Sequence, residues 1–84
     1  MYEILIEARA ERDLRRLAAE PFRRVVDGIR SLADDPTPPG CRKITGSEND
    51  WRIRVGSYRV IYEIDDEARQ VRIMRVRHRR EVYR

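Results

Sequence analysis

The 84-residue sequence has little of what several common kinds of site require. Its one cysteine, Cys41, excludes an internal disulfide, and its one histidine, His78, lies too far along the chain to form a metal site with it. There is no glycine-rich phosphate loop and no apolar run long enough for a signal peptide or a membrane span. We therefore expect a soluble, cytoplasmic protein with one domain over residues 1–84, and no metal, small-molecule cofactor or membrane partner.

Lysine is also scarce, because Lys43 is the only one among 19 basic residues, which stand against 15 acidic residues. Residues 1–42 carry 8 side chains of each sign, whereas residues 43–84 carry 11 basic and 7 acidic ones. Between Ala68 and Arg84 there are seven arginines and a single acidic residue, Glu81. Such a stretch predicts phosphate binding, with a solvated charged surface as the alternative. Arginine's planar guanidinium suits phosphate contacts and base stacking, which favours a nucleic acid as the partner.

Residues 51–64 predict a β-hairpin. The segments Trp51–Val55 and Tyr58–Ile64 alternate in polarity, and the two residues between them, Gly56 and Ser57, are typical of a tight hairpin turn. In a strand, every second side chain lies on the same face. One face of this hairpin is therefore apolar and is formed by Trp51, Ile53, Val55, Tyr58, Val60, Tyr62 and Ile64.

The other face of the predicted hairpin gathers three arginines: Arg52, Arg54 and Arg59. A two-residue turn places Arg54 directly opposite Arg59. Like charges opposite each other in an antiparallel pair are destabilising, so this arrangement indicates a role beyond folding. A polyanion would supply the opposite charge.

The rest of the chain predicts two helices and two further strands. Apolar residues recur at helical spacing in residues 9–18, and again from Pro21 to about Asp35, before a proline-rich loop. Residues 2–7 and 70–76 have strand character, although the second segment alternates less cleanly, as a strand bordered on both faces would. We expect an α+β fold of order β-α-α-β-β-β, with a mainly antiparallel four-stranded sheet, two N-terminal helices on one face and the arginines on the open face.

The tail after residue 76 carries the groups that could move protons. Cleavage of an RNA phosphodiester needs a base for the 2′-hydroxyl, charge stabilisation at phosphorus and a proton for the leaving oxygen. Arginine stabilises charge but holds its own proton tightly. His78 is the better proton donor, and the phenol of Tyr83 could act as the base if neighbouring arginines lower its pKa. The structural alternatives are a surface histidine and a terminal tyrosine that covers the core.

Three segments together resemble the RelE/ParE superfamily of bacterial toxins, on the RelE side: Trp51–Gly56, Tyr58–Ile64 and His78–Tyr83. The resemblance extends along essentially the whole chain in its order of elements. It implies the toxin half of a type II toxin-antitoxin pair, which a cognate antitoxin protein neutralises. It further implies binding to the ribosome and cleavage of mRNA in the ribosomal A site, by attack of the 2′-hydroxyl, to leave a cyclic phosphate without using a metal.

The resemblance also implies roles for single residues. Arg52 and Arg54 stand where relatives have phosphate-holding lysines, one of which helps to activate the nucleophile. Arg59 matches the arginine that stabilises the transition state. The implied catalytic set is Arg52, Arg54, Arg59, His78, Arg79 and Tyr83, with Arg79 assisting the leaving group and Tyr83 stacking or acting as base. The implied RNA-binding set is Arg52, Arg54, Arg59, Arg77 and Arg80, although relatives commonly have glycine at position 77.

Two other functions fit the same sequence. A ParE-like protein would inhibit DNA gyrase by binding, without chemistry of its own. A catalytically inactive relative would bind RNA through the arginines and would not need Tyr83. The ending from His78 to Tyr83, next to Arg59, favours the nuclease.

Overall fold

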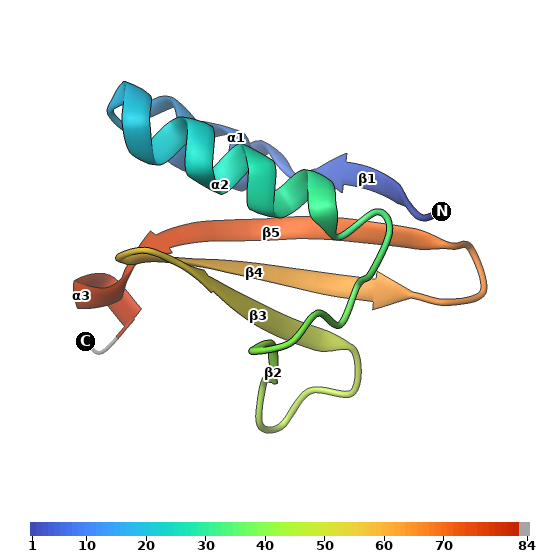
Figure 1. Cartoon of the computed structure of the whole chain (residues 1–84). Helices are drawn as coiled ribbons and strands as arrows, with labels where there is room; N and C mark the ends of the chain where they lie inside the picture. The colour runs from blue at the N-terminus through green and yellow to red at the C-terminus, as the bar shows by residue number, and fades with distance from the viewer. Residues whose placement is uncertain (83–84) are drawn as a thin grey trace.

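The structure is a computed structural model that describes residues 1–82 (Figure 1). Its elements, in chain order, are β1 (Glu3–Ile6), α1 (Ala8–Arg15), α2 (Ala19–Ser31), β2 (Arg42–Lys43), β3 (Asp50–Val55), β4 (Tyr58–Asp65), β5 (Gln70–His78) and α3 (Arg79–Val82). The strands form one sheet in the order β1-β5-β4-β3-β2, in which only the β1–β5 pair is parallel. Helices α1 and α2 lie on one face of this sheet (Figure 1). No helix within residues 1–82 has the length and apolar character needed to cross a bilayer.

The predicted α+β architecture is confirmed, with two additions. The sheet has five strands rather than four, because the two residues of β2 pair with β3 in a segment expected to be a loop. A segment this short, with both residues exposed, gives no alternating pattern to detect. The tail, for which the sequence predicts no element, forms the short helix α3.

Both long helices end earlier than their apolar spacing predicts. After α1, the N–H groups of Arg16 and Leu17 donate to the carbonyls of Asp13 and Leu14, so the last turn tightens to a three-residue spacing. Leu17 lies beyond the helix and still packs against the core. The chain also tightens after Ser31, where Leu32 donates to the carbonyl of Ile29. Apolar residues can therefore continue a core-facing stripe past the end of a helix.

The core fills the space between the two helices and the apolar face of the sheet. Its buried residues are Ala10, Leu14, Val25, Ile29, Leu32, Ile53, Val60, Tyr62, Ile64, Val71, Ile73 and Val76. Tyr62 is fully buried, and its hydroxyl donates to the carbonyl of Pro36 at 2.7 Å. Burial, together with Cys41 and Asp35 nearby, raises the pKa of this phenol. The proline-rich loop is thereby attached to the middle of the sheet.

A β-bulge explains why residues 70–76 alternate imperfectly. Tyr62 pairs with Ile73, whereas the preceding Ile61 pairs with Arg75, so Met74 is an extra residue in β5. The extra residue shifts the buried positions from Ile73 to Val76. The irregular pattern in the sequence thus reflects a change of register within one strand.

Asp13 joins α1 to β5 just past this bulge. Strand β1 ends opposite Ile73, so within residues 1–82 the next part of β5 has no strand neighbour on that side. There the Asp13 carboxylate accepts hydrogen bonds from Arg75 Nε at 2.9 Å and from the backbone N–H of Val76 at 2.9 Å. Burial raises the pKa of Asp13, but the hydrogen bonds from Arg75 and Val76 outweigh burial and leave this pKa below its ordinary value. The ionised carboxylate therefore stabilises the folded state.

We predict that Asp13→Asn lowers the free energy of unfolding by about 1–3 kcal/mol at pH 7, because buried donors lose a charged acceptor. A lowered pKa in the folded state means that the contribution is complete above the unfolded pKa of about 3.9 and is lost as the pH falls through the folded value. Urea denaturation from pH 3 to pH 7 measures both effects. Asp27→Asn, at an exposed position on α2, is the control. An equal loss in both variants would contradict the role of Asp13.

Candidate nucleic-acid interface

The β3–β4 turn sets the register of the site. Gly56 has a φ of +59°, which a glycine adopts at little cost and which suits the first central position of a type II′ turn. The two-residue turn pairs Val55 with Tyr58 and Arg54 with Arg59, as the alternation predicts.

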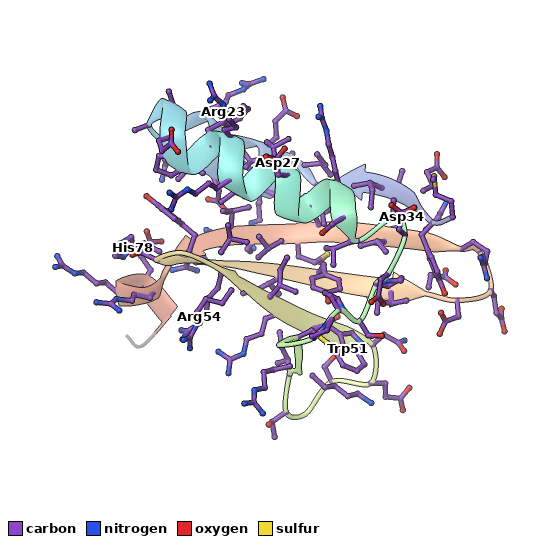
Figure 2. All side chains as sticks on the ribbon, viewed as in Figure 1. Arg23, Asp27, Asp34, Trp51, Arg54 and His78 are labelled. Carbon is purple, nitrogen blue, oxygen red and sulfur yellow. The ribbon has the colours of Figure 1, made fainter. Side chains whose placement is uncertain are left out.

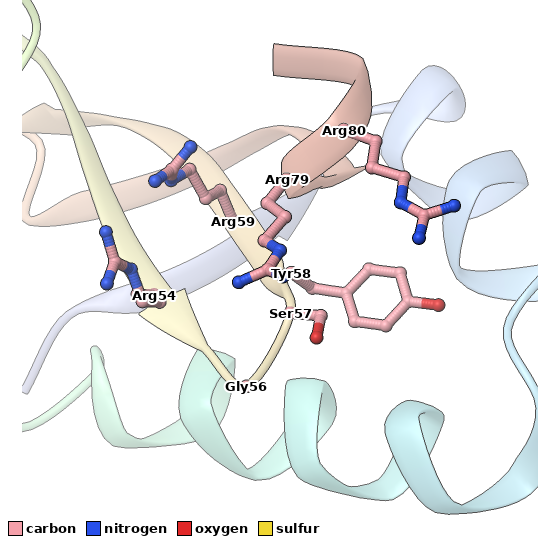
Figure 3. Close-up of a pocket in the computed structure, with 7 residues that line it drawn as sticks. All are labelled: Arg54, Gly56, Ser57, Tyr58, Arg59, Arg79 and Arg80. Carbon is pink, nitrogen blue, oxygen red and sulfur yellow. The ribbon is translucent and has the colours of Figure 1, made fainter. Parts of the chain in front are cut away.

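The same register continues into β5. Arg59 pairs with Arg54 on one side and with Arg77 on the other, so three arginines lie side by side on three neighbouring strands. We call these three residues the arginine row. Arg54 and Arg59 point away from α2, toward the face on which α3 lies (Figure 3). The expectation of arginines on the face opposite the helices is therefore confirmed for Arg54 and Arg59.

The expectation that a ligand can freely reach these arginines is wrong for Arg59. Arg59 has a relative exposure of only 3%, whereas Arg54 is exposed and Arg52 is intermediate. Alternation assigns a side chain to a face but does not reveal what covers that face. Because a buried arginine has few rotamers open to it, Arg59 is the most fixed cation of the site.

A cavity of about 310 Å³ lies beside the arginine row (Figure 3). Its lining comes from the hairpin turn and from the start of α3: Arg54, Gly56, Ser57, Tyr58, Arg59, Arg79 and Arg80. Among the described residues, the cavity lining contains four arginines and no carboxylate, so its charge suits an anion.

One hydrogen bond ties α3 to the hairpin, and two further interactions join α3 to the end of β5. The N–H of Arg79 donates to the carbonyl of Ser57 at 2.7 Å, which ties the tail to the turn. Arg77 Nε donates to the Glu81 carboxylate at 3.0 Å. The backbone N–H of Arg80 donates to His78 Nδ1 at 3.2 Å. These interactions bring Arg79 and Arg80 to the cavity, as expected if the last strand pairs beside β4.

His78 caps the N-terminus of α3. Its Nδ1 accepts a hydrogen bond from the backbone N–H of Arg80. The ring also packs edge-on against Tyr58, with centroids 5.2 Å apart. An imidazolium carries a proton on both nitrogens and could not accept this bond. His78 therefore has a structural role as the cap of α3, which its residue type alone does not predict.

The structure brings together only part of the predicted site. Arg54, Arg59, Arg79 and Arg80 line the cavity, and Arg77 adjoins Arg59 by register. Arg52 lines a neighbouring cavity, which also includes Arg42, a residue that the sequence analysis did not select. The prediction for Tyr83 lies outside the described residues. Within residues 1–82, no group of three His, Cys, Asp or Glu side chains is placed to hold a metal ion.

Comparisons with known proteins agree with this fold. Residues 4–83 match the family described as ParE toxin of type II toxin-antitoxin system, parDE. The chain is 34% identical to Toxin RelG of Mycobacterium tuberculosis over 87 residues, which cover 99% of this chain and 97% of RelG. The toxin-antitoxin complex RelBE2 of the same organism matches at 30% identity with a TM-score of 0.82, over 92% of this chain and 96% of that one.

A more distant structure is equally similar in fold. The archaeal RelE-RelB complex from Pyrococcus horikoshii matches at 25% identity with a TM-score of 0.83, over 93% of this chain and 94% of that one. The chain belongs to the RelE/ParE superfamily and is a type II toxin.

We predict that His78→Ala frees the start of α3, because an N-cap acceptor contributes about 0.5–2 kcal/mol to a helix. His78→Asn should retain the cap, since asparagine is among the preferred N-cap residues. Amide hydrogen exchange of Arg80, followed by NMR, measures the difference. Faster exchange in the alanine variant alone supports the cap, and equal exchange in all three proteins would contradict it.

Proposed function

We propose that this toxin is a metal-independent endoribonuclease that binds the ribosome and cleaves mRNA in the A site. The observation that carries the proposal is the arginine row beside a cavity whose described lining has no carboxylate. Like charges directly opposite each other reduce stability, so a bound polyanion is the simplest reason to keep them. Ribosomes are cytoplasmic, and the protein would act there.

The proposed reaction transfers the phosphoryl group within the RNA. The 2′-oxygen forms a bond to phosphorus, the bond from phosphorus to the 5′-oxygen breaks, and the products are a cyclic phosphate and a free 5′-hydroxyl. Arg54 and Arg59 would neutralise the phosphate oxygens, and Arg79 would stabilise the leaving oxygen. These three side chains supply charge but no proton transfer at ordinary pH.

The two proton transfers require other groups. We assign the base role to Tyr83, which would accept the proton of the 2′-hydroxyl as a phenolate, the form that neighbouring cations favour. His78 could donate a proton to the leaving oxygen only as an imidazolium, and this form would break the hydrogen bond to Arg80. The observed cap thus favours His78 as a positioning residue, and the leaving 5′-oxygen, stabilised by Arg79, would then take its proton from water.

The relatives support the nuclease over the gyrase inhibitor. The family description names ParE, whereas the toxin at 34% identity is RelG and the similar solved complexes contain RelE. Arg79 and Arg80, from the C-terminal tail, line the cavity, where a nuclease could use their charge on the RNA. The inactive RNA-binding alternative shares the arginines and differs in the need for Tyr83.

We also propose a cognate antitoxin as partner. The similar solved structures include complexes of RelE with RelB. An acidic, partly disordered antitoxin that folds on binding would neutralise the arginines and block access to RNA in one step.

We predict that Arg59→Ala reduces mRNA cleavage at least about 100-fold, because it removes a fixed charge from the transition state. Expression is induced in bacteria, and primer extension maps breaks within translated codons. Arg59 is buried, so circular dichroism checks the fold, and Arg59→Lys restores charge without the planar guanidinium and should recover part of the activity. Arg23→Ala, on the distant α2 surface, is the control (Figure 2). Breaks that persist in folded Arg59→Ala would remove Arg59 from the mechanism.

Tyr83→Phe separates the nuclease from an RNA-binding relative, because it removes only the hydroxyl. The nuclease should lose its breaks and keep its RNA affinity, whereas a purely RNA-binding protein would show no breaks in either form. If growth stops while mRNA stays intact and cleaved gyrase complexes accumulate, the toxin is a gyrase inhibitor.

A further inference from the structure

A second cavity adjoins the first on the side of β2. Its volume is about 460 Å³, and it shares Arg54 and Arg59 with the first cavity. Its remaining walls come from α2, from the loop at Pro38–Gly40 and from Arg42 and Arg52. The shared arginines make the two hollows one continuous surface.

The second cavity repeats the charge arrangement of the first. Arg42 of β2 pairs directly with Arg52 of β3, so two cations again lie opposite each other. Within residues 1–82, neither side chain has a carboxylate within ion-pair distance, and no acidic residue lines the cavity. This second like-charge pair is destabilising without an anionic ligand.

Part of the β3 edge beside this cavity is unpaired. Among the described residues, β2 pairs with Trp51 and Arg52 alone, so the edge of β3 from Ile53 to Val55 has no strand neighbour on that side. Gly28 allows α2 to pass close to β3, because a Cβ at that position would lie 3.0 Å from Val55 Cγ2. The unpaired edge leaves backbone groups available to a polar ligand.

The spacing of the two arginine pairs suits a chain of phosphates. Arg52 and Arg54 lie two residues apart on one face of β3, which corresponds to about 6.8 Å along the strand. The Arg42–Arg52 pair and the arginine row therefore form two parallel lines of cations. A ligand that spans both lines would carry more than one anionic group.

We propose that the second cavity is an RNA subsite, in which Arg42 and Arg52 bind the phosphate of the nucleotide next to the one at the arginine row. This inference rests on the proposed RNA-cleaving function and adds a second nucleotide to it. The site extends the contact with RNA away from α3, along the edge of β3. Arg42 is then a binding residue that does not touch the reacting atoms.

The test measures binding of single-stranded RNA in which every ribose is 2′-O-methylated, so that the strand cannot be cut. Fluorescence anisotropy compares a labelled hexanucleotide with a labelled dinucleotide that has a single bridging phosphate, at several salt concentrations. Arg42→Ala should weaken hexanucleotide binding about 10-fold and lower the salt slope by about 0.7, the contribution of one phosphate contact in a single strand. Dinucleotide binding should change less than 2-fold.

Two variants serve as controls. Arg42→Lys keeps the charge and should retain most of the salt slope, whereas Arg23→Ala removes one charge from the exposed surface of α2. If Arg42→Ala behaves like Arg23→Ala toward the hexanucleotide, the subsite is wrong. If Arg42→Ala weakens binding of the antitoxin and leaves RNA binding unchanged, the cavity is a protein contact and the subsite is again wrong.

Cleavage of mRNA on ribosomes separates this inference from the proposed function. The subsite predicts a KM raised several-fold in Arg42→Ala with kcat unchanged, because the contact is equally strong before and during reaction. Cleavage by the wild type with an unchanged KM in Arg42→Ala would overturn the subsite alone. A wild type that neither binds nor cleaves RNA would overturn both.

Discussion

The two-residue turn between β3 and β4 is the constraint on which the site depends. With Gly56 at a positive φ, the turn has one register, and this register places Arg54 against Arg59 and, through β5, Arg59 against Arg77. A slip of one residue would move the arginines into the core and expose the apolar side of the hairpin. Burial of Val60 and Tyr62 on the opposite face therefore specifies the arrangement of the cations.

The same arrangement costs stability, and the rest of the fold offsets this cost. Cations lie opposite each other at Arg54 and Arg59 and again at Arg42 and Arg52. A small domain has only a modest free energy of unfolding, so this repulsion matters. The apolar core between the sheet and the two helices stabilises the fold, and Asp13 holds α1 to β5 where β1 no longer reaches. Stability is thus gained on one face of the sheet and given up on the other.

Sequence patterns predict what local periodicity encodes. The hairpin, its register and the core-facing stripes of both helices follow from spacings of two residues and about 3.6 residues. The fifth strand and the bulge at Met74 depend on pairing between separate strands, and the cap made by His78 depends on local side-chain geometry, so the spacing of apolar residues predicts none of them. The burial of Arg59 also cannot be read from the spacing of residues, because it depends on what covers that face of the sheet. Arg42 was missed because its partner across the sheet is 10 positions away, in a segment without strand character.

The basic residues that line the first cavity are all arginines, and this limits which groups could transfer a proton there. The described lining of the first cavity offers four arginines and one phenol, Tyr58, whose hydroxyl points away from Arg54 and Arg59 (Figure 3). Arginine remains protonated, and the cap engages one nitrogen of His78. The described lining of the cavity is therefore suited to neutralising phosphate and poorly suited to moving protons. In the proposed nuclease, proton transfer would depend on the residues that follow Val82, so Tyr83 is the position that would separate a nuclease from a protein that only binds RNA.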